Sequence, residues 1–132
     1  MSERMPPHDD TVEQCLIASC LILEGHEREI MAAVQVDDFW RPVHQKMFSA
    51  ICEAVAETGA ADLVTVSNVL RNRGQLEECG GGEYLTATMN ELPTAARWPT
   101  YARRIRRYAR RREIMAWANG IEKKARDAET DF

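Results

Sequence analysis

The side chains that could do chemistry are three histidines, four cysteines and several pairs of neighbouring acids. The histidines at positions 8, 26 and 44 and the cysteines at 15, 20, 52 and 79 form no CxxC pair and show no metal-ligand spacing. No serine, histidine and acid cluster is identifiable from spacing alone. We therefore predict no metal site, no catalytic residue and no cofactor in this chain. The acid pairs fall at predicted helix starts or turns, where they favour the positive helix terminus: Asp9-Asp10, Asp37-Asp38 and Glu77-Glu78.

Gly80-Gly81-Gly82 is the segment that could cradle a phosphate. A phosphate-binding loop of the Gly-x-x-x-x-Gly-Lys-Ser/Thr type needs a lysine followed by Ser or Thr, whereas Glu83 and Tyr84 follow here. Glycine also permits positive φ and a close approach of two backbones. We predict a structural turn that opens the next helix, and no nucleotide hydrolysis by this chain.

Composition indicates one helical domain in a reducing compartment. The chain has 132 residues, of which 45% are hydrophobic, and this suits a single domain with a real core. No apolar run approaches the roughly 18 residues of a membrane span, and the polar start is unlike a secretory signal. Scattered cysteines in apolar patterns are typical of buried, reduced thiols, so we expect a cytoplasmic location.

Charge is distributed unevenly along the chain. Residues 1–96 carry 6 basic and 16 acidic side chains, a balance of −10, and residues 97–132 carry 11 basic and 5 acidic side chains, a balance of +6. Eight arginines and no acid lie between Arg97 and Arg112. Such a split predicts a charged interaction surface at one end of the domain.

Hydrophobic periodicity and capping residues predict helices throughout. Thr11 and Gln14 fit a capping box for a first helix over 12–23. Further helices are expected over 27–34, over 66–72 with Thr65 as its cap, and over 83–91 after the glycine turn.

The clearest helix begins near Pro42 and ends at Gly59. Asp38 is its candidate cap, and proline in the first turn needs no N–H partner. His44 lies one turn into this helix, and we expect it to make a capping or core-edge hydrogen bond near Asp38. Apolar residues recur at three- and four-residue spacing and predict one buried face: Val43, Met47, Phe48, Ile51 and Val55.

A last helix is predicted over 99–127, starting at Pro99 because the residue before proline disfavours the α region. Its first half has an apolar side that includes Arg112, for which we predict a carboxylate or carbonyl partner. The opposite side carries Arg103, Arg104, Arg106, Arg107, Arg110 and Arg111. Beyond Ile114 the apolar stripe changes sides, so the helix either breaks near Gly120 or docks its second half on something else. The apolar side of the first half comprises Tyr101, Ile105, Tyr108, Ala109, Arg112, Met115 and Ala116.

An ordered set of spaced residues gives the chain a family resemblance. The set comprises Pro6-Pro7-His8, Glu13-Gln14 with Leu16, Asp38-Phe39, Pro42 with His44 and Phe48, Asp62 before Leu63-Val64-Thr65-Val66, Gly74-Gln75-Leu76, Gly80-Gly81 with Tyr84-Leu85, Pro93-Thr94-Ala95-Ala96 and Tyr101. From about Met5 to about Arg126, the chain resembles the N-terminal domain of DnaB-type replicative helicases. The resemblance implies an all-α bundle of five to seven helices, with a long C-terminal helix that leads into a helical hairpin truncated here.

The same resemblance implies a division of the chain and a function. Residues 1–10 would be a flexible tail, 11–98 the helical core, and 99–132 the arginine-rich helix and the start of the dimerisation hairpin. The domain would associate with other subunits of a hexamer and dock primase or a helicase loader, without contacting nucleic acid directly. ATP and magnesium would bind only to a motor domain that this chain lacks.

The resemblance also implies roles for particular residues. Asp62 and Tyr84 match the family pattern at exposed positions, and we expect them to contact a partner. The charge split, rather than the resemblance, adds Arg103, Arg104, Arg107, Arg110 and Arg111 to the expected partner surface. The stripe expected to pair subunits comprises Ile114, Trp117, Ala118, Ile121 and Ala125. Structural roles are expected for Asp38, Phe39, Pro42, His44, Phe48, Gly80 and Gly81.

Other interpretations of the sequence stay open. The chain could be a free-standing phage or mobile-element adaptor that binds a replication protein, or a small helical DNA-binding protein. The arginine side could be solvated, contact protein or bind DNA. No aromatic residue interleaves with it, because Tyr101 and Tyr108 point to the opposite side, and this disfavours stacking on single strands.

Overall fold

The computed structural model describes residues 5–127 and residue 129, and all the regular structure within them is helical. Two 3₁₀ turns, Val36–Asp38 and Ala95–Arg97, precede α3 and α6. The predicted all-α bundle of five to seven helices is thereby confirmed. The α-helices in chain order are α1 (Asp10–Ile22), α2 (Glu27–Ala33), α3 (Pro42–Thr58), α4 (Leu63–Asn72), α5 (Gly81–Asn90) and α6 (Trp98–Arg126).

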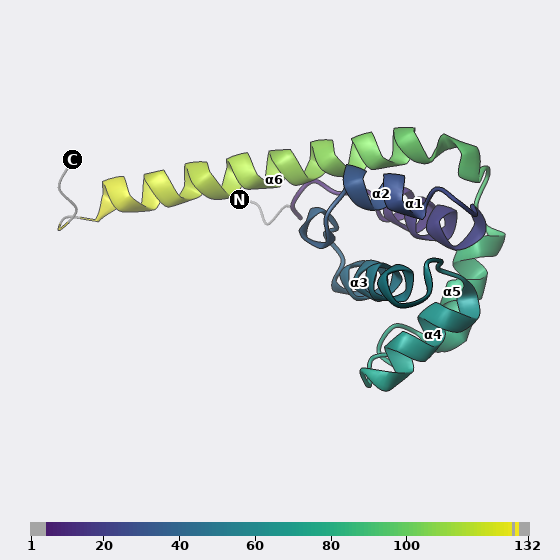
Figure 1. Cartoon of the computed structure of the whole chain (residues 1–132). Helices are drawn as coiled ribbons and strands as arrows, with labels where there is room; N and C mark the ends of the chain where they lie inside the picture. Colours follow the sequence, from purple (N-terminus) through teal and green to yellow (C-terminus); the bar gives the residue numbers. More distant parts are fainter. Residues whose placement is uncertain (1–4, 128, 130–132) are drawn as a thin grey trace.

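The helix α1 is enclosed by the rest of the bundle, because it packs against α3, α5 and α6 (Figure 1). Its residues from Cys15 to Leu21 are all buried, which is the pattern of a helix covered on every side. The buried hydroxyl of Ser19 donates to the carbonyl oxygen of Cys15 at 2.7 Å. The polar group is therefore satisfied inside the helix, and the neighbouring helices can pack closely around it.

The predicted buried face of α3 forms much of the core. Met47, Phe48 and Ile51 are almost completely buried, and the Phe48 ring packs against Phe39 with 5.0 Å between ring centroids. The helix ends at Gly59, whose φ of +85° is readily adopted only by glycine. The predicted structural roles of Phe39, Phe48 and Gly59 agree with these positions.

The helices α1 and α4 have other caps than the sequence predicts. The carboxylate of Asp9, rather than the hydroxyl of Thr11, caps α1 by accepting from the backbone N–H of Val12 at 3.0 Å. Asp62, rather than Thr65, caps α4. Both helices therefore begin earlier in the chain than predicted. Aspartate and threonine are both good caps, and the sequence offers one of each within a turn.

The predicted capping role of Asp38 on α3 is wrong. Asp38 closes the preceding 3₁₀ turn instead, where its carboxylate accepts from the backbone N–H of Gln35 at 2.8 Å. The helix begins at Pro42, as expected from its fixed φ. At the last helix, Trp98 adopts helical dihedral angles and is the first residue of α6 although a proline follows it. The steric bias before proline is overridden there, where the half-buried Trp98 packs against the core.

The helix α6 runs without a break through Gly120, and its 29 residues span about 44 Å. Its first half packs on α1 and α2, and its second half extends beyond the bundle (Figure 1). Ala102, Ile105 and Ala109 are buried in the first half, whereas Met115 is 47% exposed. The predicted core side therefore ends near Arg112, and the stripe beyond it is left uncovered by this chain.

The described end of the predicted tail over 1–10 is part of the fold. Residues 1–4 lie outside the described part of the chain, but Asp10 already belongs to α1, and His8 stacks on Trp40 with ring centroids 3.8 Å apart. The hairpin was predicted to start near the end of the chain, where residues 128 and 130–132 lie outside the described part. None of the described helices is long and apolar enough to cross a bilayer.

Candidate functional site

Residues of the spaced set converge on a buried polar network at the centre of the bundle. The carboxylate of Glu13 accepts from His44 Nδ1 at 2.7 Å and from the backbone N–H groups of Trp40 and Arg41 at 2.7 and 3.3 Å. Glu13 and His44 are each 2% exposed. The core-edge hydrogen bond predicted for His44 is confirmed, but its partner is Glu13 on α1 rather than Asp38.

The network continues from α3 to α5. A carboxylate can only accept, so His44 Nδ1 donates to Glu13, while His44 Nε2 lies within hydrogen-bond distance of the Tyr84 hydroxyl, 3.0 Å away. The Tyr84 oxygen in turn accepts from the amide of Gln14 at 2.8 Å. Each group has its partner, which makes this a rigidifying connection between three helices rather than an acid–base site. Nothing in local spacing predicts it, although the resemblance had singled out all four residues.

The glycine turn before α5 places Tyr84 in this network. Gly80 has a φ of +86°, and a Cβ at that position would stand 2.8 Å from the Cβ of Tyr84. Any side chain at Gly80 would therefore be strained and would push Tyr84 away. Gly81, with a φ of +67°, begins the helix. The predicted structural turn agrees with this geometry.

Arg112 connects α6 to the start of the chain. Its guanidinium donates to the carbonyl oxygens of Pro7 and Asp38, each at 2.8 Å. Partial burial lowers the pKa of Arg112, and the nearby charge of Glu13 opposes this shift. The predicted carbonyl partner of Arg112 is confirmed. The contact lies at the base of the projecting half of α6, where it fixes how that half leaves the bundle.

Asp62 and Tyr84, the two residues expected to contact a partner, both make contacts inside the chain. The exposed carboxylate of Asp62 accepts from the backbone N–H and the hydroxyl of Thr65 at 2.7 and 2.8 Å, and these bonds lower its pKa. Tyr84 is half-buried, and it lines a 390 Å³ pocket that His44 and Arg41 also line. Contact of either residue with a partner stays a prediction.

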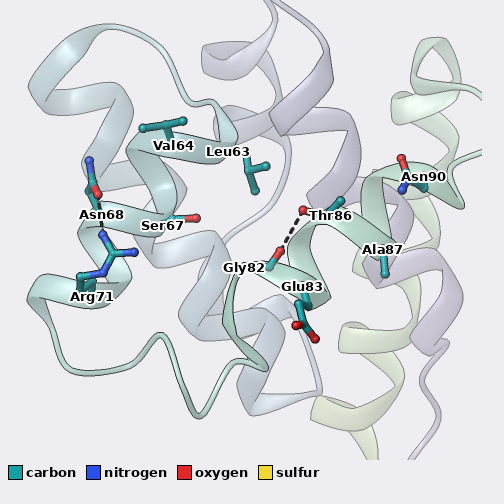
Figure 2. A pocket seen from close by; sticks show the side chains of 10 residues that line it. All are labelled: Leu63, Val64, Ser67, Asn68, Arg71, Gly82, Glu83, Thr86, Ala87 and Asn90. Carbon is teal, nitrogen blue, oxygen red and sulfur yellow. Dashed lines mark hydrogen bonds between the residues drawn. The ribbon is translucent and has the colours of Figure 1, made fainter.

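A groove between α4 and α5 was not foreseen from the sequence. It has a volume of about 680 Å³, and its apolar lining is made by Leu63, Val64 and Ala87 (Figure 2). Val64 is 68% exposed. Arg71 lies on the α4 side and Glu83 on the α5 side. Periodicity could not reveal the groove, because it depends on how two helices from adjacent segments pack.

The arginine side of α6 is exposed to solvent, and at its edge Arg106 and Arg110 also line a pocket with Ala32 and Ala33 of α2. All the arginines named for it are exposed, and Arg110 is the one that lies within 4 Å of a carboxylate among the described residues, with Glu113 at 3.8 Å. Arg111 lies over the ring of Tyr108 at 5.7 Å. The positive charge of this side is therefore largely unneutralised within the described part of the chain.

The apolar stripe on the second half of α6 is also exposed. Ile114, Trp117 and Ile121 are 56%, 70% and 42% exposed, and Ala118 and Ala125 are exposed as well. At 100° per residue these five side chains share one side of the helix. A tryptophan exposed to this extent among other apolar residues is typical of an interaction surface.

The cysteines and the metal-ligating residue types were the other candidates for chemistry. Burial raises the pKa of the Cys20 thiol and keeps it protonated; within the described residues, no three His, Cys, Asp or Glu side chains are placed to hold a metal ion. The chain presents a groove, a basic side and an apolar helical extension on a rigid bundle. The fold is thus that of a helical bundle whose exposed surfaces are typical of a protein-interaction domain.

Comparison with known proteins gives the family. Residues 5–107 match the family model of the DnaB-like helicase N-terminal domain. The chain therefore belongs to this family. It is 34% identical over 99 residues to the replicative DNA helicase DnaB of Mycobacterium leprae, which covers 75% of this chain and 16% of that protein. It is 33% identical over 122 residues to the replicative DNA helicase DnaC of Bacillus subtilis, which covers 92% of this chain and 27% of that protein.

A solved structure has the same architecture. The crystal structure of the N-terminal domain of the DnaB helicase from Mycobacterium tuberculosis superposes with a TM-score of 0.87 at 29% identity, and covers 92% of this chain and 86% of that one. The curated relatives are much longer, since the chain spans 16% and 27% of the two named above. The similarity thus covers the N-terminal domain of these helicases.

Proposed function

We propose that this chain is the non-catalytic collar domain of a hexameric replicative DNA helicase. In this role it pairs with other subunits and docks primase or a helicase loader during DNA replication. The family membership and the match to an N-terminal helicase domain support the proposal. In the intact protein, ATP-driven unwinding, with its ATP and magnesium, belongs to a motor domain outside this chain.

The observation that carries the proposal is the exposed stripe on the second half of α6. Trp117 is 70% exposed on a helix that extends beyond the bundle (Figure 1). Burying such a side chain against another apolar surface contributes roughly 1.5–3 kcal/mol. The stripe runs over about 16 Å from Ile114 to Ala125. A second copy presenting the same stripe would cover it in a self-complementary contact.

Sedimentation equilibrium tests the pairing. We expect the wild-type chain to populate species heavier than its 15.0 kDa monomer as concentration rises, and Trp117→Glu to remain monomeric because a carboxylate would be buried at the contact. Lys123→Glu is the matched control, since Lys123 lies on the opposite side of the same helix. Wild-type chain that stays monomeric at every concentration, or Trp117→Glu that associates equally well, would count against the proposal.

Docking of primase is tested by substitutions that keep the fold. Asp62→Asn removes the charge but leaves a residue that caps helices equally well, so it reports on the partner contact and not on α4. We expect it, and Tyr84→Ala, to weaken primase binding measured by titration calorimetry. Because Tyr84→Ala also opens the buried network, its stability is measured alongside. Unchanged primase affinity in both variants would remove Asp62 and Tyr84 from the interface.

A further inference from the structure

The groove between α4 and α5 has the dimensions of a seat for a short helix. Each wall is a helix of ten residues, about 15 Å long. A partner helix of two to three turns would have the same length. The volume of about 680 Å³ is large enough for several side chains from one face of such a helix. Helix-in-groove recognition uses this arrangement, with apolar anchors at three- and four-residue spacing.

Part of the groove lining is apolar and would contact an inserted anchor, although Ser67, Asn68 and Asn90 also line it. Val64 is 68% exposed at the start of α4, and Leu63 and Ala87 also line the groove. The side of α5 that faces the core carries Leu85 and Thr88, so Ala87 is free to face outward. The hydroxyl of Thr86 is used within α5, where it donates to the carbonyl of Gly82 (Figure 2).

The two walls carry opposite charges. Arg71 on α4 donates to Asn68 Oδ1 at 2.8 Å, and Glu83 lies in the first turn of α5. Within the described part of the chain, neither Arg71 nor Glu83 has an oppositely charged group within 4 Å, so the two are not paired with each other across the groove. A ligand that carries an acid on one flank and a base on the other would satisfy both residues.

We propose that this groove binds an amphipathic helix of a partner protein, two to three turns long. Its apolar stripe lies over Val64, Leu63 and Ala87, one flank places a carboxylate beside Arg71, and the other places a basic side chain beside Glu83. The inference rests on the proposed docking function and specifies what the docking partner presents. A nucleic-acid strand does not fit, because Glu83 and the nearby helix cap Asp62 would repel phosphates.

The test uses designed helical peptides as probes. Three lactam-bridged peptides of about 10 residues share one fluorescent label and one helical scaffold. The first has the apolar stripe with an acidic flank toward α4 and a basic flank toward α5, the second has the two flanks exchanged, and the third has the stripe replaced by polar residues. Fluorescence anisotropy gives the affinities, and amide chemical shifts of the isotope-labelled chain locate the contact.

The first peptide is expected to bind, with shifts concentrated at residues 63–71 and 82–90. Val64→Asp abolishes this binding, and exchanging the wall charges in R71E/E83R weakens the first peptide and strengthens the second, each by roughly tenfold. The control exchange Arg28→Glu with Glu57→Arg, two exposed residues outside the groove, leaves both affinities unchanged. No binding, shifts elsewhere, or a preference that R71E/E83R does not invert would overturn the inference.

The occupant and the proposed function are tested separately. If Val64→Asp abolishes self-association in sedimentation, the groove is filled by a second copy and the inference is wrong. If Val64→Asp leaves primase affinity unchanged while no peptide binds, the groove proposal fails and the collar function stands. If the wild-type chain neither self-associates nor binds primase, the proposed function fails, whatever the peptides show.

Discussion

Arg112 joins two segments that are far apart in the chain. Its two bonds to the carbonyls of Pro7 and Asp38 hold the first described residues, the 3₁₀ turn and α6 together. Arg112→Met keeps most of the side-chain length but leaves both carbonyls without their donor. We expect the free energy of unfolding to fall by about 1–3 kcal/mol, as measured by urea denaturation.

The control for Arg112 is its neighbour on the exposed side. Arg111→Met changes the same charge in the same helix, and we expect a change within about 0.5 kcal/mol because Arg111 is exposed and lies over the Tyr108 ring. Equal stability of the two variants would show that the carbonyl contacts of Arg112 contribute nothing.

Asp62 should make the stability of the domain depend on pH. Its pKa is lowered in the folded chain by the bonds from Thr65. Because the pKa is lower in the folded chain, the carboxylate stabilises the fold at pH values above the pKa of the unfolded chain, near 3.9. This contribution is lost as the pH falls through the pKa of the folded chain. We expect Asp62→Ala to destabilise by about 1 kcal/mol at pH 7, with a difference that shrinks on acidification below pH 4.

Asp62→Asn separates the cap from its charge. Its stability at pH 7 should lie close to wild type, because asparagine caps nearly as well. Thermal unfolding of the wild type and both variants across the acid range measures these differences. A penalty for Asp62→Ala that is constant down to the lowest pH would contradict the capping account.

At the residue scale, chemistry that depends on one side chain was predictable and chemistry that depends on distant partners was not. An arginine on an apolar stripe has to find an acceptor, so the carbonyl partners of Arg112 followed from the sequence. The partner of His44 did not, because Glu13 stands 31 residues earlier in the chain. Local spacing pointed to Asp38 instead.

At the element scale, the existence of each helix was predictable and its exact start was not. Periodic apolar residues identified all six helices, since a helix must bury one face. Asp9 and Asp62 rather than Thr11 and Thr65 became caps, because the choice between two good capping residues depends on the bundle around them. The groove between α4 and α5 lay beyond prediction for the same reason.

Gly120 is the residue that tests whether the extended half of α6 is a regular helix. It is helical, its φ is not positive, and a Cβ there would meet nothing within 4 Å. Gly120→Ala should therefore stabilise the helix locally by about 0.5–1 kcal/mol. We expect amide hydrogen exchange around residue 120 to slow severalfold, while the global unfolding transition moves little.

The opposite result at Gly120 would favour the helix break that the sequence analysis gave as one of two alternatives. Faster exchange in Gly120→Ala, or a loss of helical content by circular dichroism, would mean that the position needs a bend that alanine prevents. A helix α6 that is continuous through residue 120 would then not describe the free domain in solution.

At the scale of the whole molecule, α6 presents two different surfaces to solvent, one on each half of the helix. The first half shows arginines to solvent and the second half shows the stripe of Trp117 and Ile121. The acidic remainder of the chain, with a balance of −10, could face the arginines of another copy. A collar of repeated subunits uses both surfaces at once, which a monomeric adaptor would not require.

The mass of the native gene product tests the central claim most directly. An antibody raised against this domain would be used to blot a lysate of the source cells. We predict a band several times heavier than 15.0 kDa, as expected for a collar attached to a motor domain. A band at about 15.0 kDa would contradict the account and identify the chain as a free-standing adaptor.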